Sequence, residues 1–434
     1  MRKLISILFG MLLCIPGFAQ NSGTTGGDNE LTITGQLRSR AEYRDGYGAP
    51  RAEGSDPAAF INNRTRLSFD YKRDKLSLGF SAQQVGVWGQ YQQVDNISGM
   101  NDAASNLGRM MINEAWANLN LGGGFFMKMG RQSLVYDDER ILGGLDWNVA
   151  GRYHDALKLG YEDKQNKLHV IFAYNQNKES NFGNGYDATG QPYKSMATLW
   201  YQYLANSNFN ISFLVMNLGF QGSNAETGKS KMNNLQTFGT NLMYKPVSDL
   251  QLNGTFYYQT GQMTDQKSAA FMWAISAAYS ITPALKVLIA SDYLSGDDAT
   301  TDKNEAFNAL YGTHHKFYGT MDYFNPTPFA RGLWDKQLGL SYKASPKVNL
   351  GLNYHHFSTT TDVLVNDKKQ RTLGSEWDLQ VTWNVMKDVG FTGGYSSFFG
   401  NDVLKAIKGG DPSKLQSWAW VSLNINPKIL VTKW

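Results

Sequence analysis

Cysteine is nearly missing from this sequence of 434 residues, and its one cysteine, Cys14, lies in the apolar N-terminal stretch. Residues 1–19 have the features of a secretory signal, because Arg2 and Lys3 precede an apolar run that ends in small residues. Cys14 would leave with this signal. We therefore expect a cysteine-free mature protein, which excludes disulfides and thiolate metal sites although the destination is oxidising.

Charge and proline are also scarce. Charged residues make up 18% of the chain, against roughly 25% in ordinary soluble domains, and there are 11 prolines. The formal net charge is +4, a near balance that argues against nucleic acid as a partner. Beyond the signal, no apolar run has the length of a membrane-spanning helix. Abundant residues are glycine (44) and aromatics (13%), which favour many strands with tight turns.

Apolar and polar residues alternate with a period of two along most of the chain, which indicates strands with one apolar face. Most segments have about the 9–11 residues that a tilted membrane-spanning strand needs. Eighteen segments show the pattern: 31–42, 64–71, 75–88, 112–121, 125–132, 154–161, 167–176, 196–204, 209–221, 234–245, 249–260, 271–280, 285–295, 334–343, 347–356, 375–384, 389–398 and 417–425.

The connections between these segments alternate strictly between short and long. Outer-membrane barrels have short periplasmic turns and longer outer loops. The sequence therefore predicts an all-β, transmembrane, antiparallel up-and-down β-barrel of about 18 strands, with both termini at the periplasm. The short connections are 72–74, 122–124, 162–166, 205–208, 246–248, 281–284, 344–346 and 385–388.

An aromatic residue precedes seven of the eight short turns, each with the parity of the apolar face of its strand. Such rings favour the membrane–water interface, so we expect a girdle in contact with outer-membrane lipid. The girdle residues are Tyr71, Tyr161, Tyr203, Tyr244, Tyr279, Tyr342 and Trp383.

The predicted organisation is a signal peptide (1–19), a periplasmic linker (20–30) and a barrel (31–434). Segment 31–42 should pair with segment 417–425, because an open sheet edge cannot sit in hydrocarbon. The terminal Trp434 resembles the assembly signal of outer-membrane barrels, although Pro427 interrupts the last strand. This ending predicts the barrel-assembly machinery as a partner.

The stretch 130–156 is dense in charged and aromatic residues. Its elements, in order, are GRQ, YDD followed by Arg140, LDW, GR and HDA. This order resembles the signature of the alginate export family of outer-membrane β-barrels, and residues 306–324 resemble a later loop of that family. The resemblance implies a channel in the outer membrane of a Gram-negative bacterium. Acidic polysaccharide or small anionic solutes would pass by passive diffusion, with no cofactor. Short periplasmic turns leave export and uptake equally open.

Eleven of the thirteen arginines that follow the signal fall before residue 153. An arginine arc in a narrow pore would favour anions. The alternative is a ladder of ion pairs with Glu42, Asp70, Glu114, Asp137 and Asp138 that only stiffens the wall. The predicted pore-lining and anion-binding residues are Arg38, Arg40, Arg64, Arg66, Glu114, Lys128, Arg131, Asp138, Arg140 and Arg152.

Arg131 has the parity of Met127 and Met129, which would direct it towards lipid. Its place in the lumen follows from the family resemblance alone. It requires a bulge near Gly130 or a position above the membrane, because lipid-facing charge is costly.

The longest connection, 296–332, is rich in aromatic residues. We expect it to pack into the mouth as a constriction loop, where its rings could stack on sugars; the alternative is a lid folded on itself. The constriction residues are Phe307, Tyr311, Phe317, Tyr318, Tyr323 and Phe324. Acidic residues of this connection (Asp297, Asp298, Asp302 and Glu305) match no known calcium loop, and no metal is predicted.

Two other classes of function remain as alternatives. Ser133 with His154 and Asp155 could serve a lipid hydrolase at the membrane boundary, but no further motif supports catalysis, and no catalytic residue is predicted. A structural or adhesive barrel with a filled lumen is the second alternative.

Overall fold

The computed structural model describes residues 29–90, 109–183, 185–186, 190–223, 229–325 and 328–434. The predicted signal and nearly all of the predicted linker lie outside these residues. No helix in the described part of the chain is long and apolar enough to cross a membrane.

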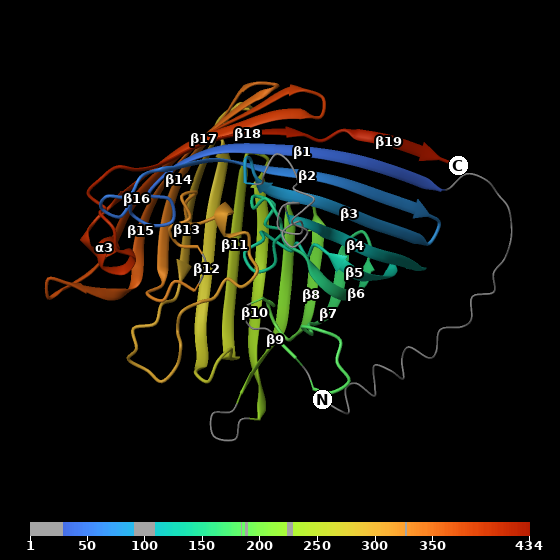
Figure 1. Cartoon of the computed structure of the whole chain (residues 1–434), viewed down its shortest axis with the longest axis horizontal. Helices are drawn as coiled ribbons and strands as arrows, with labels where there is room; N and C mark the ends of the chain where they lie inside the picture. Colours follow the sequence, from blue (N-terminus) through green and yellow to red (C-terminus); the bar gives the residue numbers. More distant parts are fainter. Residues whose placement is uncertain (1–28, 91–108, 184, 187–189, 224–228, 326–327) are drawn as a thin grey trace, which may run out of the picture.

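One antiparallel sheet forms the whole wall (Figure 1). Its strands are β1 (Glu30–Asp45), β2 (Ala58–Arg73), β3 (Leu76–Val87), β4 (Arg109–Gly122), β5 (Phe125–Gln132), β6 (His154–Glu162), β7 (Asn166–Tyr174), β8 (Ser195–Asn206), β9 (Phe209–Ser223), β10 (Ser230–Val247), β11 (Leu250–Gln262), β12 (Lys267–Ser280), β13 (Leu285–Leu294), β14 (Leu333–Ser345), β15 (Val348–Val365), β16 (Lys368–Met386), β17 (Val389–Gly400), β18 (Gln416–Ile425) and β19 (Lys428–Lys433). Two short helices, η1 (His314–Lys316) and α3 (Asp402–Lys408), lie in loops.

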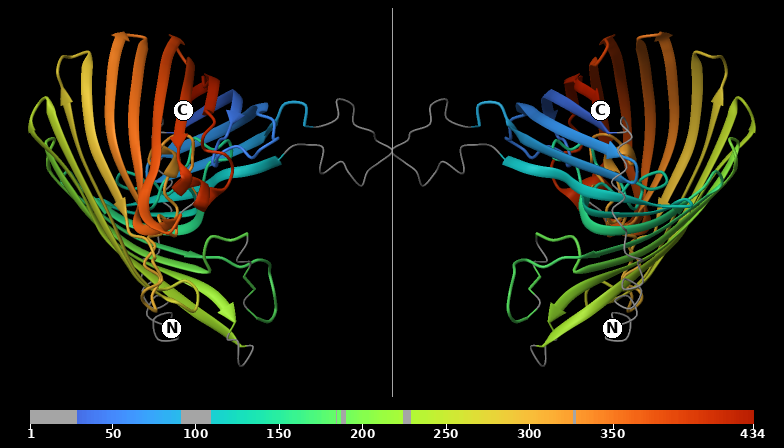
Figure 2. Two further views of the ribbon diagram at one scale, coloured as in Figure 1. Left: turned by 90° about the vertical axis from the view of Figure 1, so that its left-hand side faces the viewer. Right: turned by 90° about the vertical axis from the view of Figure 1, so that its right-hand side faces the viewer.

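The sheet closes on itself. β1 pairs with β2 on one side and with β18 and β19 on the other, so the first and last strands lie side by side (Figure 2). β18 and β19 together form the last strand position of the wall. They are separated at Pro427, whose ring nitrogen has no hydrogen to donate to the sheet. The barrel therefore has 18 strand positions, and the predicted closure between 31–42 and 417–425 is confirmed.

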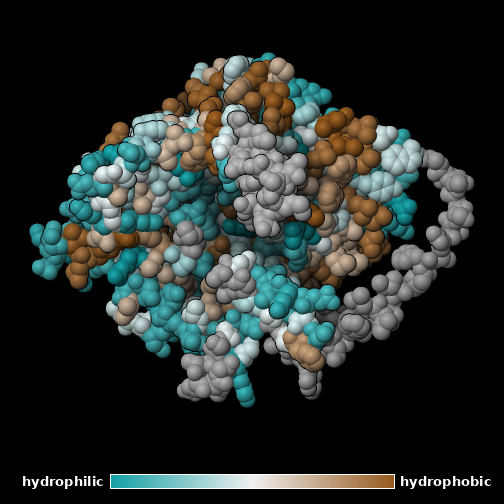
Figure 3. Space-filling model, viewed as in Figure 1, coloured by the Kyte–Doolittle hydropathy of each residue, from teal (hydrophilic) through white to brown (hydrophobic). Residues whose placement is uncertain are grey.

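Period-two alternation explains which side chains face outward. Leu37, Leu67, Phe80 and Ile289 are among the exposed large apolar residues, while Arg64 and Gln83 are buried inside. In Figure 3, hydrophobic residues gather over the strands along the top and the right, and polar residues cover much of the loop-bearing lower side. The wall therefore has an apolar outer face and a polar inner face.

The aromatic girdle is also present at the ends of the strands that precede short turns. Tyr203, Tyr244, Tyr279, Tyr342 and Trp383 are between 37% and 51% exposed on the outer face. This placement fits rings that lie at the interface between lipid and water.

Two predicted long connections are wrong. The connection predicted between residues 260 and 271 is a four-residue turn, 263–266, because β11 and β12 pair up to Gln262 and Lys267. Residues 357–374 form the extended ends of β15 and β16, joined by a turn at Asn366 and Asp367. Both turn residues have positive φ, 50° and 62°, as two-residue hairpin turns that match the strand twist require. The hairpin therefore continues the two strands beyond the end that the sequence pattern predicted.

We expect Leu338→Arg to destabilise the barrel by roughly 2–4 kcal/mol, because Leu338 is 54% exposed on the outer face of β14 and a charge there would meet hydrocarbon. The matched control is Gln337→Arg, one residue away on the lumen side. Reversible urea unfolding in lipid bilayers measures both. Equal destabilisation by the two variants would contradict the assignment of the faces.

Candidate functional site: a lumen crossed by two loops

Four of the predicted arginines lie together on the inner wall of β1 and β2. Arg38, Arg40, Arg64 and Arg66 all have the inward parity, and Arg38 is directly opposite Arg64 in the sheet register. Like charges at opposed positions repel each other. The cluster therefore requires negative partners, and it obtains them from one strand residue and from one loop.

Glu42, on β1, is the strand partner. Its Oε1 accepts from Arg40 Nε at 2.8 Å, and its Oε2 accepts from Arg44 Nη2 at 2.7 Å and from Trp418 Nε1 at 3.1 Å. The Glu42 side chain is fully buried. Part of the arginine arc thus forms ion pairs within the wall, as the alternative of a stiffening ladder predicted.

Asp146, in the connection 133–153, is the loop partner. Its carboxylate accepts from Arg64 Nη1 at 2.8 Å and from Arg38 Nη1 at 3.1 Å. Burial alone would raise the pKa of Asp146, but the hydrogen bond from Arg64 and the charges of Arg64, Arg38 and Arg66 hold the pKa below its ordinary value. The Asp146 side chain is 67% exposed, whereas that of Arg64 is 1% exposed. A solvent-facing carboxylate therefore rests on a buried arginine pair.

The cationic groups of this cluster outnumber its carboxylates. Arg38, Arg40, Arg44, Arg64 and Arg66 face Glu42 and Asp146, and Arg66 hydrogen-bonds the amide of Gln83 rather than an acid. The inward carboxylate of Glu114, on β4, also lies close enough to attract Arg66. Five positive and three negative groups give an excess of two positive charges. Arg51 and Asp45, which pair with each other, leave this excess unchanged.

The same loop reaches a second part of the wall through Arg140. Its guanidinium pairs bidentately with Asp292 on β13, at 2.8 and 3.0 Å, and with Asp138 at 2.9 Å. The Arg140 guanidinium also stacks 3.9 Å from the ring centroid of Phe317. Connection 133–153 therefore crosses the lumen from β1 and β2 to β13.

A second loop, 295–332, packs against the first. Backbone hydrogen bonds join Tyr311 N to Ile141 O at 3.0 Å and Gly143 N to Tyr311 O at 2.9 Å. Buried Glu376 on β16 accepts from Met321 N at 2.8 Å and fixes the far end of this loop to the wall. The two loops therefore form one layer inside the barrel.

The predicted constriction loop is inside the barrel, but most of its rings do not face an open space. Phe307, Tyr318, Tyr323 and Phe324 are at most 2% exposed and pack against the wall or the other loop. Tyr311 contacts the rings of His154 and Tyr193. Only Phe317 of the six lines the main cavity. The expectation that these rings offer sugar-stacking surfaces is therefore wrong for Phe307, Tyr318, Tyr323 and Phe324, because the loop needs them for its own core.

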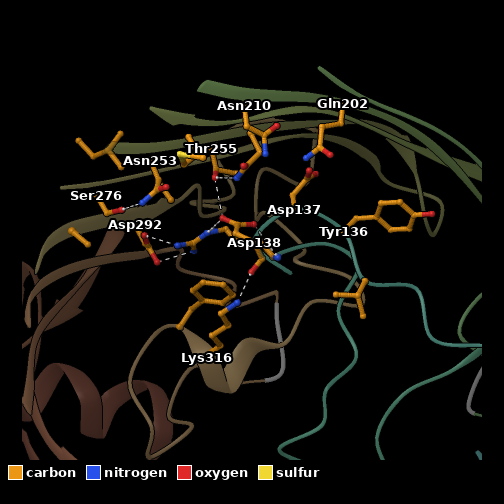
Figure 4. Close-up of a pocket in the computed structure, with 18 of the residues that line it drawn as sticks. Tyr136, Asp137, Asp138, Gln202, Asn210, Asn253, Thr255, Ser276, Asp292 and Lys316 are labelled. Atoms are coloured by element: carbon orange, nitrogen blue, oxygen red, sulfur yellow. Dashed lines mark hydrogen bonds and ion pairs between the residues drawn. The ribbon is translucent and has the colours of Figure 1, made fainter. Parts of the chain in front are cut away.

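The main cavity has a volume of about 800 Å³ and lies between the loops and strands β6–β14. Figure 4 shows Asp137, Asp138 and Asp292 in it, with Lys316 reaching from η1 towards Asp138. Lys316 Nζ donates to the Asp138 carbonyl oxygen at 3.2 Å. Burial raises the pKa of Asp137, although hydrogen bonds from Ser212 and Trp200 oppose the shift.

The lumen position predicted for Arg131 is wrong. Arg131 alternates with outward Met129, which is 59% exposed, and its guanidinium pairs with Asp155 at 2.9 and 3.0 Å on the outer face. The pairing of β5 with β4 and with β6 continues through Gly130 without a bulge. The register shift in this region lies in β4 instead, between Ile112 and Glu114, which pair with Ala82 and Ser81 of β3. Parity therefore holds, and a carboxylate compensates the charge.

The other predicted residues have separate positions. Glu114 faces inward on β4 and accepts from Ser133 N at 3.1 Å. Lys128 faces inward on β5, with its Nζ 3.6 Å from the ring centroid of Trp116. Arg152 donates to Gly312 O at 2.9 Å and ties the two loops together. Lys128 therefore lies on a different part of the wall from the arginine cluster of β1 and β2.

The hydrolase alternative finds no support in the geometry. His154 points inward, where its Nδ1 is 2.8 Å from Tyr193 Oη, while adjacent Asp155 pairs with Arg131 outside. The carboxylate is thus on the opposite face of the sheet and cannot orient the imidazole. Ser133 shares no hydrogen bond with His154 among the described residues.

Sequence reasoning missed three lysines and one aspartate of the main cavity: Lys158, Lys167, Lys316 and Asp292. The alternation of apolar and polar residues along the strands already placed Lys158, Lys167 and Asp292 on the inner face. The position of Lys316 depends on how the second loop folds, which no local pattern encodes. Loop carboxylates Asp297, Asp298 and Glu305 converge within 4.8 Å, but the first two hydrogen-bond to the backbone of their own turn.

Fold and site together define a transmembrane β-barrel of the outer-membrane type whose lumen is narrowed by inward-folded loops. The chain belongs to the alginate export family, whose sequence pattern matches residues 29–415. No curated protein matches it in sequence.

Solved structures similar to this chain support the fold. OccAB1 of Acinetobacter baumannii is 14% identical, with a TM-score of 0.63 over 92% of this chain and 97% of its own. OccK3 (OpdO) of Pseudomonas aeruginosa is 10% identical, with a TM-score of 0.61 over 92% and 96%. OccK5 (OpdH) of the same organism is 10% identical, with a TM-score of 0.59 over 93% and 99%.

We expect Asp146→Asn to loosen connection 133–153, because it removes the charge that pairs with Arg38 and Arg64. Solvent screening at an exposed carboxylate limits the loss to about 1 kcal/mol, or about fivefold faster amide exchange in residues 144–151. Hydrogen exchange followed by mass spectrometry measures this.

The effect has a defined pH dependence. The pKa of Asp146 is lowered in the folded state, so its contribution is present above the ordinary carboxyl range and is lost as pH falls through the lowered value. The difference between wild type and variant should therefore vanish in acid. A constant difference at all pH values would contradict the role of this charge.

Proposed function

We propose that this chain is a passive outer-membrane channel that favours anionic solutes, including acidic polysaccharide or its fragments. The observation that carries the proposal is the excess of two positive charges in the arginine cluster at the loop layer. Membership of the alginate export family supports the same class of solute.

The cluster has the properties of an anion attractor. Guanidinium groups stay charged at all physiological pH values and bind carboxylates as planar forks. A narrow lumen with low-dielectric walls concentrates their field, which raises the local concentration of anions. The loop layer sets the size limit, and the lumen contains open space of about 800 Å³ next to it. Because the transport is passive, solutes would move in either direction down their gradients.

The proposal includes the route by which the protein reaches the membrane. Residues 1–19 would act as a cleaved signal, residues 20–30 as a periplasmic linker up to β1, and the C-terminal strand would be recognised by the barrel-assembly machinery. The last residue, Trp434, stands next to Tyr71 of the girdle, with ring centroids 6.2 Å apart. Outer-membrane lipid would cover the apolar outer face.

Liposome swelling tests the solute preference. We expect proteoliposomes to admit glucuronate faster than glucose, and glucose faster than glucosamine, since these solutes are similar in size and differ in charge. Arg66→Gln, and more strongly Arg38→Gln with Arg66→Gln, should reduce the ratio of glucuronate to glucosamine rates severalfold.

Arg371→Gln is the matched control, because Arg371 pairs with Asp362 in the outer hairpin, away from the cluster. It should leave the ratio unchanged. Equal rates for the three solutes in the wild type, or a faster rate for glucosamine, would overturn the proposal.

A further inference from the structure

A pair of lysines faces the lumen on the wall formed by β4, β5 and β6, away from the arginine cluster. Lys128 and Lys158 are directly opposite each other in the register of β5 and β6. Like charges at such positions destabilise a sheet. Neither ammonium pairs with a carboxylate in the described part of the chain; each instead lies near a ring, of Trp116 and of Phe126 respectively.

Glycine makes room for both rings on the wall. A Cβ atom on Gly79 would lie 2.3 Å from the Trp116 ring, and one on Gly160 would lie 2.2 Å from the Phe126 ring. Each ring therefore occupies the space directly over a glycine of the neighbouring strand. The indole Nε1 of Trp116 is buried and has no hydrogen-bond partner. The wall thus carries two rings and two unpaired ammonium groups.

These four side chains line one cavity of about 580 Å³ at the short-turn end of the barrel, where residues 122–124 join β4 to β5. Lys158 also lines the main cavity of about 800 Å³ under the loop layer. The group therefore lies between the main cavity and the periplasmic opening, on the side of the barrel where β4–β6 are labelled in Figure 1.

The positive charges of the two lysines are more available to a solute anion than those of the arginine cluster. Asp146 and Glu42 already bind Arg38, Arg40 and Arg64, and those arginines hold the loop. Among the described residues the two lysines form no ion pair and hold no loop, although the carboxylate of Glu162 lines the same cavity and pairs with His169 instead. A solute anion can therefore meet them without displacing part of the protein.

We propose that Trp116, Phe126, Lys128 and Lys158 form a binding site for a carboxylate carried on a ring. The ammonium groups would turn from the two rings to the carboxylate, which frees the lumen-facing side of each ring to stack on the apolar face of the solute ring. The site deepens the proposed function, because it would act on solutes that pass through the channel. Ring and charge are both required, which separates this site from a general anion attractor.

The test is block of the potassium chloride current through the protein in a planar bilayer, with probe added on the periplasmic side. Three probes separate the sources of affinity: benzoate has an aromatic ring, glucuronate a sugar ring, and acetate no ring. We expect benzoate or glucuronate to block at lower concentration than acetate. The better of the two identifies the kind of ring.

Variants assign the block to the site. Lys128→Gln with Lys158→Gln should raise the half-blocking concentration of the ring acids about fivefold or more. Trp116→Leu and Phe126→Leu should raise it for ring acids while leaving acetate unchanged. Lys343→Gln is the matched control, because Lys343 has the inward parity at the short-turn end of β14 and its ammonium lies over no ring in the described part of the chain. It should have no effect.

The outcomes separate this site from the channel itself. An anion-selective current whose block by ring acids equals that by acetate, or is unchanged in the lysine and ring variants, overturns the site and leaves the channel. A cation-selective protein, or one without conductance, overturns the proposed function. Conductance of each variant shows that it is folded.

Discussion

The whole structure depends on one constraint: in hydrocarbon, every backbone N–H and C=O must find a partner within the protein. A sheet satisfies this only by closing, and here β1 meets β18 and β19. Closure of 18 strand positions leaves a lumen too wide for wall side chains to fill. The inward-folded loops follow from that width, because they narrow a space that the wall alone leaves open.

The loops are held in the lumen by charge as well as by apolar packing. Buried guanidinium groups are costly unless they are paired. Asp146 of connection 133–153 pairs with Arg64 of the wall, and Arg140 of the same connection pairs with Asp292 of the wall. The arginine cluster thus has two roles: part of its charge anchors the loop, and the excess is available to solutes.

Much of the wall was predictable because a membrane strand repeats every two residues. The need to pair both sheet edges predicted the closure. Strand parity predicted the girdle, and it correctly directed Arg131 outward where the family resemblance placed it inside. The β15–β16 hairpin was missed because its polar outer end shows no apolar alternation above the membrane. Its turn at Asn366 and Asp367 was the one local indication.

The interior of the barrel was less predictable. Pairs such as Arg140 with Asp292 join residues 152 positions apart, and loop folding decides which side chains meet. Aromatic content of the loop 295–332 correctly indicated packing inside the barrel. It could not show that Tyr323 and Phe324 would be consumed by the loop's own core. Solved barrels that are 10–14% identical share the fold of the wall with this chain.

The central claim is that fixed positive charge in the lumen selects anions. The most direct measurement is the reversal potential of the purified wild-type protein in a planar bilayer that separates two potassium chloride concentrations. Chloride permeability should exceed potassium permeability, and the preference should weaken at high salt as the charges are screened. A reversal potential of the sign for potassium preference, or a folded barrel without conductance, would contradict the account.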